Sequence, residues 1–405
     1  MTKALRALAL TLTILLSSAP TAFCQTTWAG GSEPAWLSLE RGKKAYAAKD
    51  FGSALVHFDN AISLRRDSFT AALVRLDQAL DTKAAKAGED SIARVLAAFA
   101  AEDFIQRDYI NLAAGQLASS KPLLEALRKE RLSDSHRAFI DVLLSVLEYR
   151  PMQVLGDSIA GLRTHVQLLS KYPEAELWKG KVFFLEGELP IAETQYRRAY
   201  DMSPSLEIPE ERFTILYAMA ALYDAGSNFV AWENIMKSIV AGNDEVIDPY
   251  LRDAMMATLL DQGFDRFMTL YRLQPSYSLE ANAALGSYYL ERGRAAASMH
   301  AAIAVNMTLT QAISMLVRKD SDYVWKGLDD FMERSRRDSG VVAYLSEARL
   351  PRLLLTLADA LYISGARITA AKIWKTVVAE GTAPFAAVAQ QRITSPASAV
   401  RRQAP

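Results

Sequence analysis

The sequence predicts an all-α fold, a superhelix (solenoid) of about eight to ten stacked antiparallel helical hairpins. Three observations predict this fold. One segment of about 34 residues shows the pattern of a helix, a glycine turn and a second helix. Similar units recur along most of the chain. Half of the 405 residues are apolar, while glycine and proline number only 19 and 14, which favours folded helices over disorder.

The segment 173–206 shows the unit most clearly. Gly187 is expected to end the first helix, because glycine adopts the left-handed conformation without a Cβ clash. Pro190 suits the first turn of the second helix, where its missing N–H costs nothing, and Pro204 ends the pair. The apolar positions, at helical spacing, are Leu177, Gly180, Phe183 and Phe184 in the first helix and Ile191, Ala192, Tyr196, Ala199 and Tyr200 in the second.

This segment closely resembles a tetratricopeptide repeat. The resemblance rests on the pattern's characteristic positions, occupied here by Gly180, Phe183, Gly187, Ala192, Tyr196, Ala199 and Pro204. Leu189 departs from the family pattern, which usually has an aromatic residue there, but it conserves bulk. The resemblance implies a right-handed superhelix whose first helices line a concave groove.

Two further segments, 35–66 and 279–306, match the unit well, and a last recognisable hairpin covers 352–380. Arg66 stands where the pattern has proline, so the second helix of the first copy is expected to continue straight into the following segment. Helical periodicity in a more diverged form covers 68–149, 151–172, 209–239, 249–275 and 308–346. We therefore expect the solenoid to span 35–392, with a disordered tail at 393–405.

The amino-terminal 24 residues have the pattern of a secretory signal peptide. Lys3 and Arg6 precede an apolar run of about ten residues, too short for a stable membrane anchor. Cleavage before Gln25 would remove Cys24, the sole cysteine. The alternative is lipidation of Cys24, favoured by the polar linker 25–34 but opposed by the bulky Phe23. Both alternatives predict export to the periplasm or cell envelope, and no later segment is predicted to span the membrane.

Composition and motifs argue against catalysis, cofactors and nucleic-acid binding. The formal net charge is zero, which gives no basis for attracting a polyanion. The four histidines lack the spacing of a zinc helix, and no phosphate-binding loop or nucleophile motif is present. Asp329 and Asp330 diverge by about 100° on a helix, which favours solvated charges over a catalytic pair. The short basic clusters at 127–131 and 334–337 are interpreted as exposed helix faces. We predict a non-enzymatic protein without metal or cofactor.

The predicted binding surface is the concave groove. By register with the family pattern, its candidate residues are Lys43, Tyr46, Lys181, Phe184, Ala220, Tyr223, Ser287 and Glu291. Cationic, aromatic and small groups suit an extended peptide or a partner's helix, although Tyr46, Phe184 and Tyr223 could equally pack between helices. The lysine and asparagine set with which related arrays capture a peptide's terminal carboxylate is not evident.

The sequence thus favours an exported interaction scaffold that binds a protein partner in its groove. Two alternatives stay open. One is a helical domain associated with a cell-wall enzyme system, and the other is a periplasmic small-ligand or transporter-associated binding protein. The partner, pathway and oligomeric state are not encoded in any motif.

Overall fold

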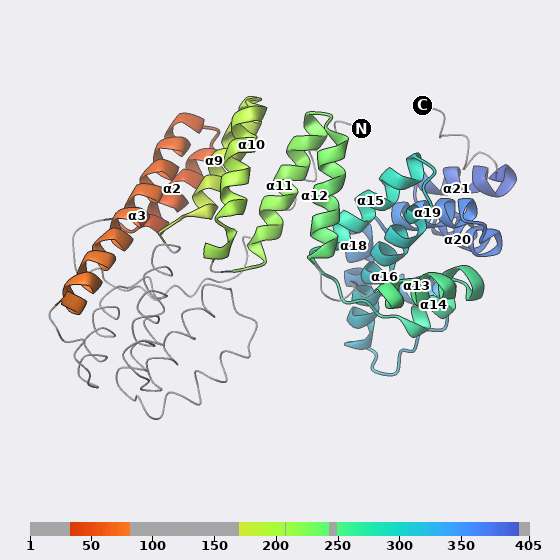
Figure 1. The fold of residues 1–405 in the computed structure, drawn as a ribbon. Helices are drawn as coiled ribbons and strands as arrows, with labels where there is room; N and C mark the ends of the chain where they lie inside the picture. The colour runs from red at the N-terminus through yellow and green to blue at the C-terminus, as the bar shows by residue number, and fades with distance from the viewer. Residues whose placement is uncertain (1–32, 82–169, 207, 243–248, 397–405) are drawn as a thin grey trace.

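The computed structural model describes residues 33–81, 170–206, 208–242 and 249–396. Within these ranges the chain forms fifteen α-helices and no β-strand, which confirms the predicted all-α fold (Figure 1). The predicted signal peptide, Cys24 and most of the segments 25–34, 68–149 and 151–172 lie outside the described residues. In chain order the helices are α2 (Ala35–Ala47), α3 (Phe51–Asp81), α9 (Pro173–Glu186), α10 (Leu189–Asp201), α11 (Glu211–Ala225), α12 (Phe229–Ala241), α13 (Pro249–Ala257), α14 (Phe264–Leu270), α15 (Leu279–Glu291), α16 (Ala296–Val317), α17 (Leu328–Ser335), α18 (Ser339–Glu347), α19 (Leu350–Ile363), α20 (Arg367–Glu380) and α21 (Phe385–Thr394).

The helices from α2 to α12 form a stack of hairpins, which we call the N-terminal stack. Within each pair the two helices pack against each other, and each pair then contacts the next through its second helix. Helix α9 packs directly on α3 and α2, and α11 packs on α10 (Figure 1). Two apolar clusters hold this region, one between α2, α3 and α9 and the other running from α9 to α15. The burial pattern is that of a solenoid, in which each repeat covers its neighbour.

A glycine in each well-matched first helix permits the close approach of its partner helix. A Cβ atom on Gly180 would lie 2.5 Å from the Tyr196 ring, and one on Gly42 would lie 2.4 Å from the Phe58 ring. In the third copy a Cβ on Gly286 would meet the backbone nitrogen of Ala301 at 3.0 Å. These glycines are therefore required by packing, which is the physical basis of the repeat pattern in this chain.

The turns confirm several sequence predictions. Gly187 adopts the left-handed conformation with φ of 84° and ends α9, and Pro190 lies in the first turn of α10. Helix α3 runs without a break through Arg66 to Asp81, as the absence of a proline at that position predicted. Helix α11 ends at Ala225 with Gly226 as its C-cap, and the left-handed residue that follows is Ser227.

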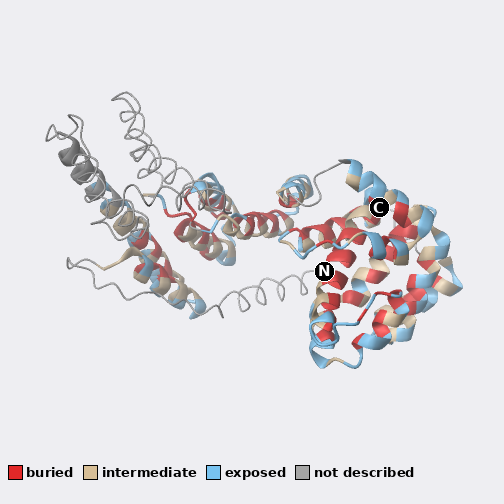
Figure 2. Cartoon of the chain, turned by 90° about the horizontal axis from the view of Figure 1, so that it is seen from below, coloured by how far each residue is buried: buried red, intermediate tan, exposed pale blue. Residues whose placement is uncertain are grey.

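The C-terminal region, α13 to α21, departs from a regular stack. Helix α15 packs on α12, so the α13–α14 hairpin that lies between them in sequence is displaced from the line of the stack. Residues of that hairpin and of α16 to α21 together form one large apolar cluster. Figure 2 shows the consequence, a narrow stripe of buried residues along the N-terminal stack and a broader buried mass in the C-terminal region.

Asp265 on α14 holds the displaced hairpin in place. Its carboxylate accepts a hydrogen bond from the backbone N–H of Leu328, at 2.9 Å, and forms an ion pair with Lys372 on α20. Its backbone carbonyl accepts from the indole of Trp325 at 3.3 Å. One residue therefore joins α14, the segment before α17, and α20.

Three predicted boundaries in this region were wrong. The second helix of the 279–306 copy does not end at Asn306, because α16 continues for 22 residues to Val317. Helix α14 ends at Leu270, where Tyr271 becomes extended, and not at Pro275. Helix α21 extends to Thr394, past the predicted start of the tail at 393.

Helix α16 is the one helix of the described residues long and apolar enough to cross a membrane by length and composition. However, 72% of that apolar window is buried inside the protein. Neighbouring helices therefore cover its apolar surface, as expected for the core helix of a folded domain.

Candidate functional site

The first helices of successive hairpins share one side of the molecule, which we call the first-helix face. It is formed by α2, α9, α11 and α15. Helix α2 contacts α9, and α9 contacts α11. Helix α11 reaches α15 through Tyr217, whose hydroxyl donates to the carbonyl of Tyr277 and accepts from the backbone N–H of Ala281 at 3.1 Å. Predicted groove residues from separate repeats therefore lie on neighbouring helices of one surface.

A cluster of two lysines and two aromatic rings lies where α2 meets α9. We call Lys43, Tyr46, Trp178 and Lys181 the Trp178 cluster. The Lys181 ammonium lies 4.0 Å from the centroid of the Trp178 ring, and the Lys43 ammonium lies 5.9 Å from the same centroid. Tyr46 meets that ring edge-on at 5.1 Å. The geometry brings three predicted site residues together around a tryptophan that the sequence analysis did not select.

The electrostatics of Lys181 distinguish it from the other lysines nearby. Among the described residues Lys181 has no ion pair, whereas Lys43 pairs with Glu40 at 2.7 Å and Lys179 pairs with Asp59 at 2.7 Å. Burial lowers the pKa of Lys181 to about 8, and the positive charge of Lys43 lowers it further, against a smaller opposing effect from Glu211. Within the described residues this partly buried ammonium thus has no ion-pair partner, and the charge of Glu211 offsets it only in part.

Three other predicted site residues differ in how far they are buried and lie outside the Trp178 cluster. Phe184 is partly buried and packs into the cluster that runs along α9 to α15. Ser287 is half-buried and Glu291 is exposed, both near the end of α15. Neither lies in the Trp178 cluster.

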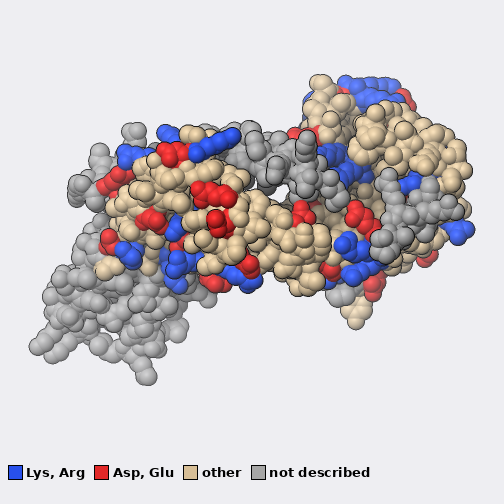
Figure 3. All heavy atoms as spheres, turned by 90° about the horizontal axis from the view of Figure 1, so that it is seen from above, with Lys and Arg blue, Asp and Glu red and all other residues tan. Residues whose placement is uncertain are grey.

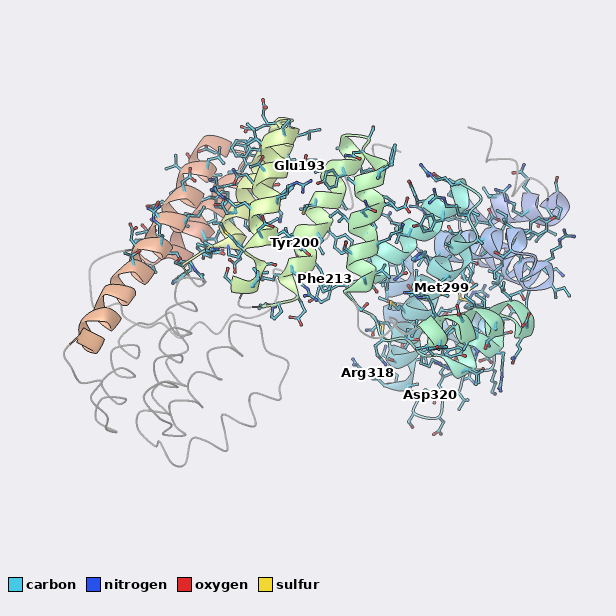
Figure 4. The ribbon with its side chains drawn as sticks, in the orientation of Figure 1. Glu193, Tyr200, Phe213, Met299, Arg318 and Asp320 are labelled. Atoms are coloured by element: carbon cyan, nitrogen blue, oxygen red, sulfur yellow. The ribbon has the colours of Figure 1, made fainter. Side chains whose placement is uncertain are left out.

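Tyr223 is a packing residue and not an open part of the groove, since it is only 4% exposed, and Ala220 beside it is also buried. The Tyr223 hydroxyl donates to Glu193 on α10 at 3.0 Å and accepts from Arg197 at 2.9 Å. Figure 4 labels Glu193 on the side of α10 toward α11. This contact joins two successive hairpins.

A second polar group on this side was missed by sequence reasoning. Burial raises the pKa of Glu280 on α15, and Arg349 and Arg352, at the start of α19, oppose that rise. Burial also raises the pKa of Tyr344 to about 12, with a further contribution from Glu280. Residues far apart in sequence are thus brought together by the packing of α15 on α19 and of α18 on α19, which no local pattern could reveal.

Two of the polar residues considered for chemistry, His300 and Asp329, have structural partners. The Nδ1–H of His300 donates a hydrogen bond to the amide oxygen of Asn282 at 2.8 Å, and burial lowers the pKa of His300 to about 4, so this side chain is neutral at physiological pH. Asp329 accepts from Thr376 at 2.6 Å. Within the described ranges no group of three metal-binding side chains occurs.

On the face shown in Figure 3, the described charged residues are of both signs. Lysines and arginines alternate with aspartates and glutamates on the side seen in Figure 3. The basic cluster 334–337 is paired, as Arg336 bonds to Glu380 at 2.7 Å and Arg337 to Glu333 at 2.9 Å. This agrees with its interpretation as an exposed helix face, while the cluster 127–131 lies outside the described residues.

Comparisons with known proteins add a relative but no function. No family model matches the chain. An uncharacterized protein of Treponema pallidum (strain Nichols) is 25% identical over 342 residues, covering 83% of this chain and 82% of that protein. The crystal structure of the P58(IPK) TPR domain is 14% identical and covers 91% of this chain and 98% of that domain, with a TM-score of 0.19. At that score the two chains do not superpose as wholes, so the helical solenoid rests on the packing described above.

Proposed function

We propose that the protein is a non-catalytic scaffold that binds a segment of a partner protein along its first-helix face. The observation that carries this proposal is the Trp178 cluster, in which side chains from α2 and α9 present cationic and aromatic groups at one surface. Such groups commonly anchor partners in protein interfaces.

The architecture supports the same proposal. A stack of hairpins creates an extended surface from many short helices, and such surfaces bind extended segments or helices of other proteins. Phe184 and Ser287 lie further along the same surface and would extend the binding region beyond the Trp178 cluster. Binding alone requires no metal or nucleophile, which is consistent with the structural roles of His300 and Asp329.

We also propose that the protein acts outside the cytoplasm, in the periplasm or cell envelope. The support is the signal-peptide pattern of residues 1–24, with the choice between removal and lipidation of Cys24 left to experiment. The mass of the mature amino terminus separates the two outcomes. Detection of the uncleaved start of the chain on the mature protein would contradict export by this signal.

Site-specific photo-crosslinking in cells tests the scaffold proposal. A photoreactive amino acid at Phe184 or Ser287 should crosslink the partner. The control positions are Val56 on α3 and Tyr200 on α10, which are exposed side chains of second helices. Crosslinks from the second-helix positions alone would contradict the proposal.

The main rival is a small-ligand binding protein. Native mass spectrometry of the purified protein would detect a retained metabolite or lipid. A stoichiometric small molecule, displaced by substitution on the first-helix face, would favour that rival over the scaffold.

A further inference from the structure

The Trp178 cluster holds more positive charge than the fold neutralises. Two ammonium groups from different helices lie 4.0 and 5.9 Å from the centroid of one indole ring. Like charges in a partly buried setting disfavour each other. Glu40 compensates Lys43 at 2.7 Å, but no carboxylate of the described residues pairs with Lys181. In the described part of the chain, Lys181 is therefore the ammonium of this cluster that has no ion pair, and Glu211 offsets its charge only in part.

Lys179, on the same helix, shows how a structural lysine is arranged in this stack. Its ammonium bonds to Asp59 on α3 at 2.7 Å and lies 3.7 Å from Glu176. It therefore joins two hairpins. Lys181 makes no comparable bridge, and a methionine would pack on Trp178 without the cost of a partly buried charge. The charged ammonium of Lys181 thus lowers the free energy of unfolding, and it would attract a negatively charged ligand.

The surroundings indicate which anion would fit. Trp178 and Tyr46 supply flat apolar surface beside the two ammonium groups, which suits an acidic side chain on a polypeptide better than a hydrated inorganic ion. The surface continues from α2 across α9 to α11, so a bound segment could extend over three helices. Glu211 on α11 acts electrostatically on Lys181 and disfavours further acidic groups on that side.

We propose that the Trp178 cluster is a carboxylate-binding subsite for an acidic side chain of a partner protein, with Lys181 and Lys43 neutralising the carboxylate and Trp178 packing against its chain. This inference rests on the proposed function, because it places one residue of the bound segment. It adds that the bound segment carries an acidic side chain at the place where α2 meets α9.

The test uses the mature full-length protein and two short fluorescein-labelled peptides, one rich in glutamate and a twin with glutamine at every glutamate position. Binding is measured by fluorescence polarisation at low and at physiological ionic strength. The variants are Lys181→Met and Lys43→Met. The matched control is Lys44→Met, which removes an exposed lysine adjacent in sequence to Lys43. Circular dichroism of each variant verifies that its helices are intact.

The glutamate peptide is expected to bind at least about tenfold more tightly than its glutamine twin, a difference of about 1.4 kcal/mol. Lys181→Met and Lys43→Met should each remove most of that preference, whereas Lys44→Met should retain it. Equal binding of the two peptides, or an unchanged preference in Lys181→Met, would overturn the inference. Failure of the glutamate peptide to bind, with inorganic phosphate changing Trp178 fluorescence instead, would also overturn it and would assign the site to a free anion.

Failure of this inference is distinguishable from failure of the scaffold proposal. If crosslinking from Phe184 persists unchanged in the Lys43→Met, Lys181→Met double variant, the scaffold stands and the carboxylate subsite falls. If first-helix positions give no crosslink in the wild type, the scaffold itself falls.

Discussion

The N-terminal stack and the C-terminal region are made from the same kind of helical hairpin, but they bury their apolar surfaces in different ways. In the stack, α9 contributes buried residues to one cluster with α2 and α3 and to another with α10 and α11. In the C-terminal region, α13, α14 and α16 to α21 share one cluster around the long helix α16. Local sequence therefore specified each hairpin. The contacts between hairpins determined whether a buried cluster is shared by neighbouring pairs or by a whole region.

The difference has consequences for stability and for binding. In a stack, stability is close to a sum of repeat and neighbour terms, so damage spreads mainly to adjacent pairs. In a shared core, damage is expected to spread to the whole region. The Trp178 cluster lies on the first-helix face of the stack, whereas the C-terminal region contains the buried ion pair of Asp359 and Arg392. Four substitutions test this comparison.

The largest effect is expected for Asp359→Ala in the C-terminal region. Asp359 and Arg392 are only 6% and 3% exposed, and the Arg392 Nε lies 3.2 Å from the Asp359 carboxylate. The Trp374 indole also donates to Asp359, at 2.9 Å. Leaving the Arg392 charge buried without this partner should cost about 3–5 kcal/mol of unfolding free energy. Hydrogen exchange should rise together in α19, α20 and α21.

A double variant, Asp359→Leu with Arg392→Met, serves as the control. It removes both charges and should destabilise the protein much less than Asp359→Ala. If Asp359→Ala unfolds at the wild-type denaturant midpoint, or if its effect is confined to one helix, the shared-core description is wrong.

Gly180→Ala should have the next largest effect, now in the N-terminal stack. The added Cβ would lie 2.5 Å from the Tyr196 ring, which is 1% exposed and has no space to move. Overpacking of this kind costs about 1–3 kcal/mol. Hydrogen exchange should rise in α9, α10 and their immediate neighbours while α16 to α21 stay protected.

The matched control is Gly52→Ala on α3, where the added Cβ would approach nothing closer than 4.0 Å. Alanine there should be neutral or stabilising by up to about 1 kcal/mol, because it favours helix. Equal destabilisation by both substitutions would contradict the packing explanation of the repeat glycine.

Lys181→Met should increase stability, which would be unusual for loss of a charged residue. Burial and Lys43 lower the pKa of Lys181 from 10.5 to about 8. Between these values the unfolded chain binds more protons, so wild-type stability rises with pH from about 8 to about 10.5. Below pH 8 the folded chain carries the full cost of the charge. The gain at pH 7 should be on the order of 1 kcal/mol, reduced by solvent screening.

Thermal denaturation of wild type and Lys181→Met at pH 7 and at pH 10.5 measures this gain. The difference in stability should disappear at the higher pH, where both folded chains are neutral at this position. A Lys181→Met protein that is less stable at pH 7 would show that the lysine has a structural role.

The smallest effect is expected for Asn228→Ala, at the start of α12. The Asn228 side chain accepts a hydrogen bond from the backbone N–H of Ala231 at 3.2 Å and so caps the helix. Its loss should cost about 0.5–1 kcal/mol. The denaturant midpoint of the N-terminal stack would reveal the change, and Asn228→Asp, which preserves an acceptor, should restore it.

Much of the hairpin structure could be predicted from local pattern because its determinants are close in sequence. Gly187 and Pro190 define one turn, and Gly180 with Tyr196 defines one helix contact, all within a single repeat. The candidate site was only partly predictable. Register selected Lys43, Tyr46 and Lys181, but Trp178 was missed, since a tryptophan in a first helix looks locally like another core residue.

The sequence by itself determined that the described chain is helical, where most hairpins turn, and which side chains share a face, because helix period and turn chemistry are local properties. The tertiary structure alone decided that α3 is followed by α9 in the stack, that α13–α14 leaves the line of hairpins, and that α16 becomes a core helix. It also decided that Lys179 pairs with Asp59 and Glu176, whereas Lys181 has no ion pair within the described residues. These outcomes depend on contacts between residues distant in sequence, whose energies no local pattern records.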